Sequence, residues 1–393
     1  MSEHPLLLRL RQLTGARSAR RGPAAVAVAV AVLVALALPL YLSSFWLQTG
    51  LFAMAAIVGA IGLTLLVGVA GQLSLGHAFF VAVGAYTYAY LAGKPPPGSG
   101  TGPGGLGLPP SVALVGAVLA AGIAGAAFSP IAGRVRGIYL GLASLGLVFL
   151  GQHIMLNATG VTGGFNGRDA QPFSLFGFSF SNAHPDPERL IVLGVPFGML
   201  ERLWYAALLL VAVAWWYARN VVAGPPGRAL ATLRDSEVAA AVMGVGVARY
   251  KAAAFTVSSM YAGLAGVLMA LAYGRIVPDT FGLALSIDFL VMIVIGGIGS
   301  VGGAAAGAVF VTALPLILNH YSSVLPLAEP GTGGIGAAEL SRFLYGAAVI
   351  GVLLFAHDGI AGLLRSRRRP PADPPGSAIR PDSDPTEVKE TAR

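Results

Sequence analysis

A short polar segment stands inside an otherwise apolar part of the chain. The run GQLSLGH contains Gly71, Gln72, Ser74, Gly76 and His77. The three polar side chains can hydrogen-bond a polar solute, and the glycines can unwind a helix and expose its backbone to a cavity. The alternative is a tight turn between two helices, in which a neighbouring carbonyl satisfies the imidazole. Both interpretations stay open at this point.

A second glycine-rich segment interrupts the apolar stretch 289–318, which is too long for one straight span. Its glycines include Gly296, Gly297 and Gly299. Interrupted helices in corresponding positions of the two halves of a transporter mark a transport site near the membrane midplane. We therefore predict that both glycine-interrupted segments line a translocation path for a small polar solute.

A third informative stretch lies between Arg228 and Phe255. Arg234, Asp235 and Glu237 precede apolar residues spaced as on one face of a helix, and Gly244 breaks that helix. A short amphipathic helix of this kind lies on lipid or docks into the groove of a partner protein. The small alanines favour a protein groove, whereas a merely solvated surface helix is the alternative.

The sequence lacks the residue patterns of several kinds of catalytic and binding site. The chain has no cysteine, its histidines are far apart in sequence, and no nucleophile lies next to a base. It lacks the run G-x-x-x-x-G-K-[ST], so it cannot cradle nucleotide phosphates itself. No basic and aromatic pattern indicates nucleic-acid binding. Asp279 and Asp288 could bind an ion, but we interpret them as polar anchors of an outer loop.

The elements that position these residues must be membrane helices. Hydrophobic residues make up 55% of the chain and charged residues only 11%, against about 25% in soluble proteins. Apolar stretches long enough to span a bilayer recur along the chain. The predicted spans are 24–42, 51–70, 73–91, 112–128, 138–156, 203–221, 252–273 and 343–364, with 289–318 broken into two shorter segments.

The positions of the basic residues predict the topology. With the N-terminus cytoplasmic and 289–318 crossing twice, the basic clusters of the loops fall on the inner side. When the far tail is left out of the count, only six basic residues lie on the outer side: Lys94, Arg168, Arg189, Arg202, Arg275 and Arg342. The fold class is thus an all-α polytopic bundle of about ten segments with broken or re-entrant helices and both termini cytoplasmic.

The chain divides into three parts by composition. Residues 1–23 form a basic cytoplasmic N-terminus, and residues 24–364 form the membrane domain, with 228–251 as a cytoplasmic loop. Residues 365–393 are rich in proline and mixed charge, which predicts a disordered tail. The stretches 93–110 and 157–202 are predicted to be outer loops.

Six motifs stand in a fixed order along the chain: GQLSLGHAFFVAVGAY, RGIYLGLASLGL, TGGFNG, RDSEVAAAVMGVGVARYKAAAF, IGGIGSVGGAAAGA and LYGAAVIGVLLF. Together, and in this order, they resemble the LivM-type permeases of branched-chain amino acid ABC importers. The resemblance covers most of the chain, about 51–364.

This resemblance implies a role, partners and a location. The chain would be a transport subunit of the bacterial plasma membrane and not an enzyme, with no cofactor of its own. Its partners would be two ATP-binding subunits, a second related permease subunit, an external solute-binding protein and membrane lipid. The loop that docks on the ATPases would include Glu237, Ala239, Ala240 and Gly244.

Two points stay open. Gly244 follows Glu237 at seven residues instead of the six of the broader importer pattern, which leaves the exact docking contacts undefined. The sequence does not name the solute, since urea and short-amide importers use related permeases.

The rival class is a secondary transporter or channel driven by an ion gradient. Paired carboxylates inside the membrane would favour it, and spans one to five contain none.

Overall fold

The structure is a computed structural model that describes residues 33–94, 104–135, 137–175, 177–182, 191–192, 195–321, 337–355 and 362. The described chain is mostly helical, with three two-stranded hairpins or ladders. The predicted N-terminal segment 1–23 and tail 365–393 lie outside the described residues, as do parts of the first and last predicted spans.

The helices follow the predicted order closely. They are η1 (Leu38–Leu40), α3 (Ser44–Leu63), η2 (Thr64–Val69), α4 (His77–Ala92), α5 (Pro110–Arg134), α6 (Ile138–Asn157), α7 (Thr159–Thr162), η3 (Gly164–Asn166), α8 (Met199–Ala223), α9 (Pro225–Asp235), α10 (Glu237–Val242), α11 (Val247–Tyr273), η4 (Pro278–Phe281), α12 (Leu283–Gly296), α13 (Val301–His320) and α14 (Ala337–Phe355).

Six of these helical segments are long and apolar enough to cross a membrane. They are Ser44–Val69, which joins α3 and η2, and the helices α5, α6, α8, α11 and α13. The helix α12 is apolar but shorter. The all-α membrane bundle is therefore confirmed, whereas the count of ten segments and the side of each terminus stay predictions.

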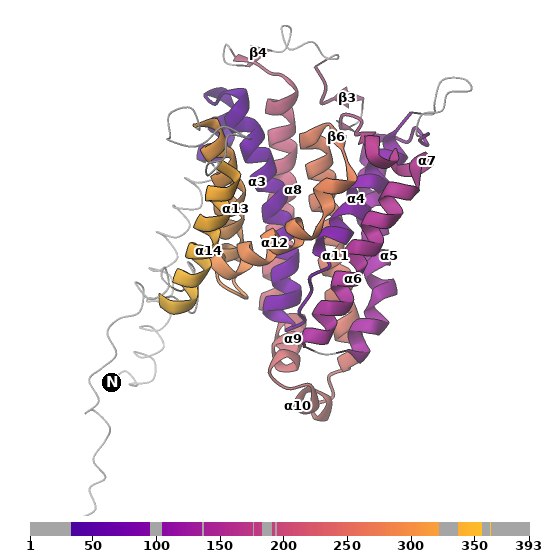
Figure 1. Ribbon diagram of the computed structural model, residues 1–393, viewed down its shortest axis with the longest axis vertical. Helices are drawn as coiled ribbons and strands as arrows, with labels where there is room; N and C mark the ends of the chain where they lie inside the picture. Colours follow the sequence, from indigo (N-terminus) through magenta and orange to yellow (C-terminus); the bar gives the residue numbers. More distant parts are fainter. Residues whose placement is uncertain are drawn as a thin grey trace, which may run out of the picture.

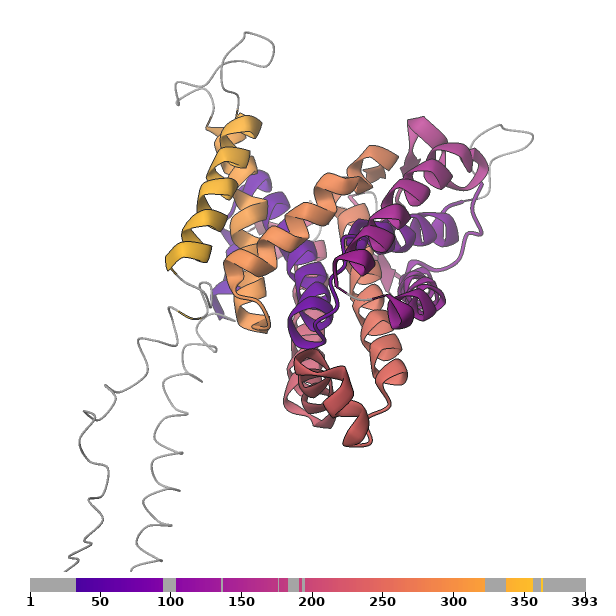
Figure 2. The same ribbon diagram turned by 60° about the horizontal axis from the view of Figure 1, so that its bottom comes forward.

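The core of the bundle is formed by α3, α4 and α11, whose residues are mostly buried. The helices α4 and α5 pack on one side of α11, and α8 and α13 pack on α3 (Figure 1). Figure 2 shows α13 and α14 on one side of this core and α5 and α6 on the other. Small residues permit the closest approaches: a Cβ at Gly84 of α4 would overlap the backbone of Gly263 of α11.

The predicted break in the stretch 289–318 is confirmed. The helix α12 ends at Gly296 and α13 begins at Val301. Gly297 and Gly299 have φ values of 109° and 85°, which glycine adopts without the steric cost that a Cβ brings. The Ser300 hydroxyl then accepts a hydrogen bond of 3.1 Å from the amide of Gly303 and caps α13.

The two ends of the bundle differ in character. At one end, here called the loop end, α9 and α10 project beyond the other helices (Figure 1). At the opposite end, the hairpin end, lie the strand pairs β1 (Arg168–Asp169) with β6 (Arg275–Ile276), β2 (Ser174–Leu175) with β3 (Phe178–Ser179), and β4 (Ile191–Val192) with β5 (Val195–Pro196). The described part of the predicted outer loop 157–202 thus contains short helical turns and strands.

Candidate functional site

The chain between η2 and α4 turns back into the bundle as an extended segment. The imidazole Nε2 of His77, at the start of α4, lies 3.0 Å from the carbonyl oxygen of Gly59 in α3. Gly59 precedes Val69, the last residue of η2, by ten residues, or about 15 Å along a helix. The helix α4 therefore begins at mid-depth and not at a membrane surface. The segment is more than the simple interhelical turn that the sequence also allowed.

Several buried hydroxyl groups around this segment hydrogen-bond its backbone amides. The Ser144 hydroxyl of α6 accepts a 2.8 Å hydrogen bond from the Leu75 amide, and the Ser286 hydroxyl of α12 accepts one of 3.0 Å from the Ala78 amide. The Ser74 hydroxyl accepts from the Gly76 amide at 3.3 Å. His77 thus has the carbonyl partner that the packing interpretation predicts. The assignment of Ser74, Gly76 and His77 to a solute path stays a prediction.

Gly71 and Gln72 lie against the predicted docking loop. The Gln72 amide donates to the Lys251 carbonyl at 3.4 Å, although 179 residues separate them. Gly71 has φ +69°, and a Cβ there would lie 2.6 Å from Cγ of Arg234. Glycine is therefore required both by the backbone conformation and by the close approach of α9.

Charged side chains of three successive helices meet at this place. Lys251 of α11 is only 3% exposed, and its Nζ lies 2.5 Å from Oε1 of Glu237 in α10. Arg234 of α9 donates a 3.0 Å hydrogen bond to the carbonyl of Gly68 in η2. We call Gln72, Arg234, Glu237 and Lys251 the loop-end cluster. It lines a cavity of about 140 Å³.

The loop-end cluster links the docking loop to the membrane helices by charge. An ammonium group buried without its carboxylate costs about 3–5 kcal/mol, because neither water nor another charge stabilises it. Movement of Glu237 away from the bundle is therefore opposed unless Lys251 follows. The pair therefore ties α10 to α11 electrostatically.

The second glycine-interrupted segment reaches the same place from the other side. A Cβ at Gly68 of η2 would lie 2.6 Å from Cα of Gly299, so the turn between α12 and α13 rests directly on η2. Thr64–Val69 is π-helical, a distortion found frequently at functional sites. Gly68 thus connects the two predicted path segments, and its carbonyl also accepts the hydrogen bond from Arg234. Within the second segment, Gly296 packs on the backbone of Gly303.

The helix α10 is short, capped and largely exposed. The Ser236 hydroxyl caps it by accepting from the Ala239 amide at 3.2 Å, and Gly244 closes it with φ +80°. Ala240 faces inward and is fully buried. The side chains that point outward are Val238, Val242 and Met243, exposed by 72%, 84% and 64%. These exposed apolar residues at the tip of the loop end are the candidate docking face.

Arg168 is one of the buried cations that the sequence did not single out as site residues. Arg168 is 3% exposed and donates to the carbonyls of Ala89 at 2.9 Å and Gly104 at 2.7 Å, as well as to that of Val161. Its guanidinium also lies 5.3 Å from the ring centre of Tyr90. Burial lowers the pKa of Arg168 from its usual value. We call this arrangement the Arg168 clasp; its sequence signal is the arginine that directly follows TGGFNG.

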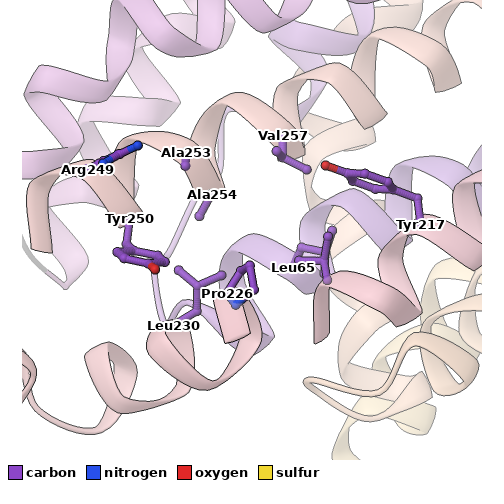
Figure 3. A pocket seen from close by; sticks show the side chains of 10 residues that line it. Leu65, Tyr217, Pro226, Leu230, Arg249, Tyr250, Ala253, Ala254 and Val257 are labelled. Atoms are coloured by element: carbon purple, nitrogen blue, oxygen red, sulfur yellow. The ribbon is translucent and has the colours of Figure 1, made fainter. Parts of the chain in front are cut away.

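A mostly apolar cavity lies beside α9 (Figure 3). Its volume is about 400 Å³, and its polar side chains are those of Tyr217, Arg249 and Tyr250. Pro226 and Leu230 of α9 form part of its wall. Within the described residues, no three His, Asp or Glu side chains are placed to hold a metal ion.

Comparison with known proteins identifies the family. Residues 45–353 match the family described as "Branched-chain amino acid transport system / permease component". The chain belongs to this permease family. The matched residues include both glycine-interrupted segments, the loop-end cluster and the Arg168 clasp, so the whole site lies in the part that defines the permease.

Among its relatives are two permease proteins named LivM. The present chain is 33% identical to the LivM of Salmonella typhimurium over 73% of this chain and 67% of the relative. It is 33% identical to the LivM of Escherichia coli over 67% of this chain and 61% of the relative. It thus spans about two thirds of the length of these relatives. It is 25% identical to the LivH permease protein of Escherichia coli over 72% of this chain and 92% of the relative. No solved structure matches significantly.

Membership of the family decides two earlier expectations. The protein is a transport subunit of the multi-pass membrane class, not an enzyme, and hydrolysis of ATP belongs to other subunits of such systems. The LivM relatives are named for high-affinity branched-chain amino acid transport. The family match gives no support to a transporter driven by an ion gradient.

Proposed function

We propose that this chain is the membrane-spanning permease subunit of an ATP-driven importer in the bacterial plasma membrane. It translocates branched-chain amino acids or related small solutes that an external binding protein delivers. Two partner subunits bind and hydrolyse ATP, and a second related permease subunit completes the pore. The chain binds no cofactor and no nucleic acid itself. The match to the permease family carries this proposal.

The geometry of the loop end supports the coupling role. The helix α10 offers an exposed apolar face beyond the bundle, and its first residue, Glu237, holds the buried Lys251. A surface helix with apolar residues fits a groove of a partner protein. We infer that α10 docks on an ATPase subunit, with Arg234, Asp235, Glu237, Ala239, Ala240 and Gly244 as the coupling residues.

Two contacts would carry the motion inward. When the ATPases close, displacement of α10 pulls α11 through the Glu237–Lys251 pair. Displacement of α9 moves η2 through the bond of Arg234 to the Gly68 carbonyl, and the turn at Gly299 rests on Gly68. Closure of the ATPases would therefore displace both glycine-interrupted segments. This is the arrangement that alternating access requires.

The two segments would form this subunit's part of the path. Its residues are Gly71, Gln72, Ser74, Gly76, His77, Gly296, Gly297 and Gly299. The Gln72 oxygen Oε1 is buried and has no hydrogen-bond partner among the described residues. A free acceptor of this kind suits transient contact with a polar solute. The partner permease would cover the opposite wall.

The topology belongs to the same proposal. Ten membrane segments with both termini cytoplasmic place the loop end inside and the hairpin end outside, as the basic residues indicate. The exposed apolar residues of α5, α6 and α8, such as Val115, Phe149 and Trp216, would then face lipid or the second permease.

Reconstitution tests the proposed function. Proteoliposomes that contain this chain, both ATPases and the second permease should take up leucine only with ATP inside and loaded binding protein outside. A gradient of protons or sodium without ATP should give no uptake. Uptake driven by an ion gradient alone would replace the proposal by the rival class.

Cysteine labelling tests the topology. A cysteine at Ser236 should react with an impermeant reagent only from the inner face, and labelling from outside would overturn the proposed topology.

A further inference from the structure

A second cavity lies between α3, α11, α12 and α13, away from the loop-end cluster. Its volume is about 260 Å³, and its polar lining includes Asp288 and Thr312. The sequence led us to expect Asp288 in an outer loop. That expectation is wrong, because Asp288 lies within α12, a helix of fourteen residues. The carboxyl group opens onto a cavity inside the membrane part of the bundle.

The polar groups of this cavity lack partners within the described part of the chain. No hydrogen bond or ion pair is formed there by the Asp288 carboxyl, and the buried hydroxyl of Thr312 has no acceptor or donor. The guanidinium of Arg342 in α14 is near enough for its charge to act on Asp288. An ionisable side chain inside a membrane domain is costly and marks a functional site by default.

The rest of the wall is apolar. It is formed by Phe52, Met269, Leu285, Phe289, Met292 and Val311, among others. An apolar cavity of about 150 Å³ holds a benzene molecule, so 260 Å³ accommodates a small amphipathic solute. A carboxylate and a hydroxyl beside such a wall match a ligand with a cationic head and a branched apolar tail.

We propose that the Asp288 cavity is a binding site for the solute, in which Asp288 receives the α-ammonium group and the apolar wall receives the side chain. This inference rests on the proposed function and adds a residue to it. A fixed charge beside a solute path can trap a zwitterion. The opposing charge of Arg342 weakens the attraction of Asp288, so that the solute is held and then released.

Purified complex in nanodiscs gives the direct test. We expect L-leucine to raise the thermal stability of the complex in the absence of binding protein, whereas 4-methylpentanoate, which lacks the amine, should have no effect. Asp288→Asn should abolish the response to leucine, and Asp288→Glu should keep part of it. The matched control is Asp279→Asn, which removes an exposed carboxyl outside the cavity.

Transport separates this inference from the proposed function. In proteoliposomes, Asp288→Asn should lower leucine uptake at least about tenfold, as expected for one lost charge-assisted contact. Loaded binding protein should still stimulate ATP hydrolysis, because the loop-end cluster is intact. Asp279→Asn should transport like the wild type.

Three outcomes would overturn the proposal. Wild-type leucine uptake and binding by Asp288→Asn would assign Asp288 to packing. An equal response to leucine and 4-methylpentanoate would show that the amine is not recognised. Dependence of wild-type uptake on a sodium or proton gradient, lost in Asp288→Asn, would make Asp288 an ion site. By contrast, a wild-type complex that transports no amino acid with ATP would refute the proposed function itself.

Discussion

Buried cations lie at both ends of the bundle, and two of them, Arg168 and Lys251, are held in different ways. Arg168, at the hairpin end, donates to three backbone carbonyls from separate segments. Lys251, at the loop end, pairs with the side chain of Glu237 on a helix of six residues. Backbone carbonyls of packed elements cannot move without distorting the fold, whereas a carboxylate on a projecting helix can. We infer that the hairpin end is fixed and that the loop end transmits motion.

The largest expected effect follows from removing the fixed cation. Arg168→Met leaves the carbonyls of Ala89, Gly104 and Val161 without their donor, which should destabilise the protein by at least about 3 kcal/mol. We expect poor recovery of monodisperse protein and a clearly lower thermal midpoint by fluorescence-detected size exclusion. The matched control is Arg275→Met, whose ion pair with Asp169 is exposed and worth about 0–1 kcal/mol. Equal midpoints for both variants would refute the Arg168 clasp.

The next effect separates function from stability. Glu237→Gln leaves Lys251 buried without its counter-ion, so the link between α10 and α11 is lost. We expect leucine uptake to fall at least about tenfold while the complex still assembles and hydrolyses ATP. Asp169→Asn, which loses an exposed ion pair at the hairpin end, is the control and should transport normally. A normal uptake rate in Glu237→Gln would remove the coupling role of the pair.

Local features of both ends follow from the sequence, but their contacts do not. Gly297 and Gly299 predicted the break between α12 and α13, and the residues around Glu237 predicted a short exposed helix, because both depend on neighbouring residues. The contact of Gln72 with Lys251 joins residues 179 apart, and nothing local encodes it. Likewise, the depth at which α4 begins depends on the packing of His77 against α3.

A smaller effect should follow from separating η2 from the turn between α12 and α13. Gly68→Ala places a methyl group against the backbone of Gly299, which must then move away. We expect uptake to fall several-fold, with ATPase subunits still bound in a pull-down assay. Gly302→Ala is the control, since its added methyl group lies 3.6 Å from Trp215, an ordinary contact. Equal uptake by the two variants would leave Gly68 and Gly299 as packing residues only.

The smallest effect is expected at the tip of the loop end. Gly244 has φ +80° and no atom within 4 Å of an added Cβ, so Gly244→Ala brings only backbone strain of about 1 kcal/mol. Uptake should change by less than about twofold. Gly244→Trp has the same strain but adds bulk beside the docking face, and it should uncouple ATP hydrolysis from uptake. A similar loss in both variants would assign the effect to the fold of α10 instead of to docking.

The central claim is that Glu237 and Lys251 pass the work of ATP hydrolysis to the membrane helices. The most direct measurement is the number of leucine molecules transported per ATP hydrolysed in proteoliposomes. We predict that Glu237→Lys and Lys251→Glu each lower this ratio at least about tenfold, because each places like charges in contact. The double variant with the charges exchanged should recover most of the ratio. Single variants with a wild-type ratio, or a double variant as uncoupled as the worse single one, would contradict the account.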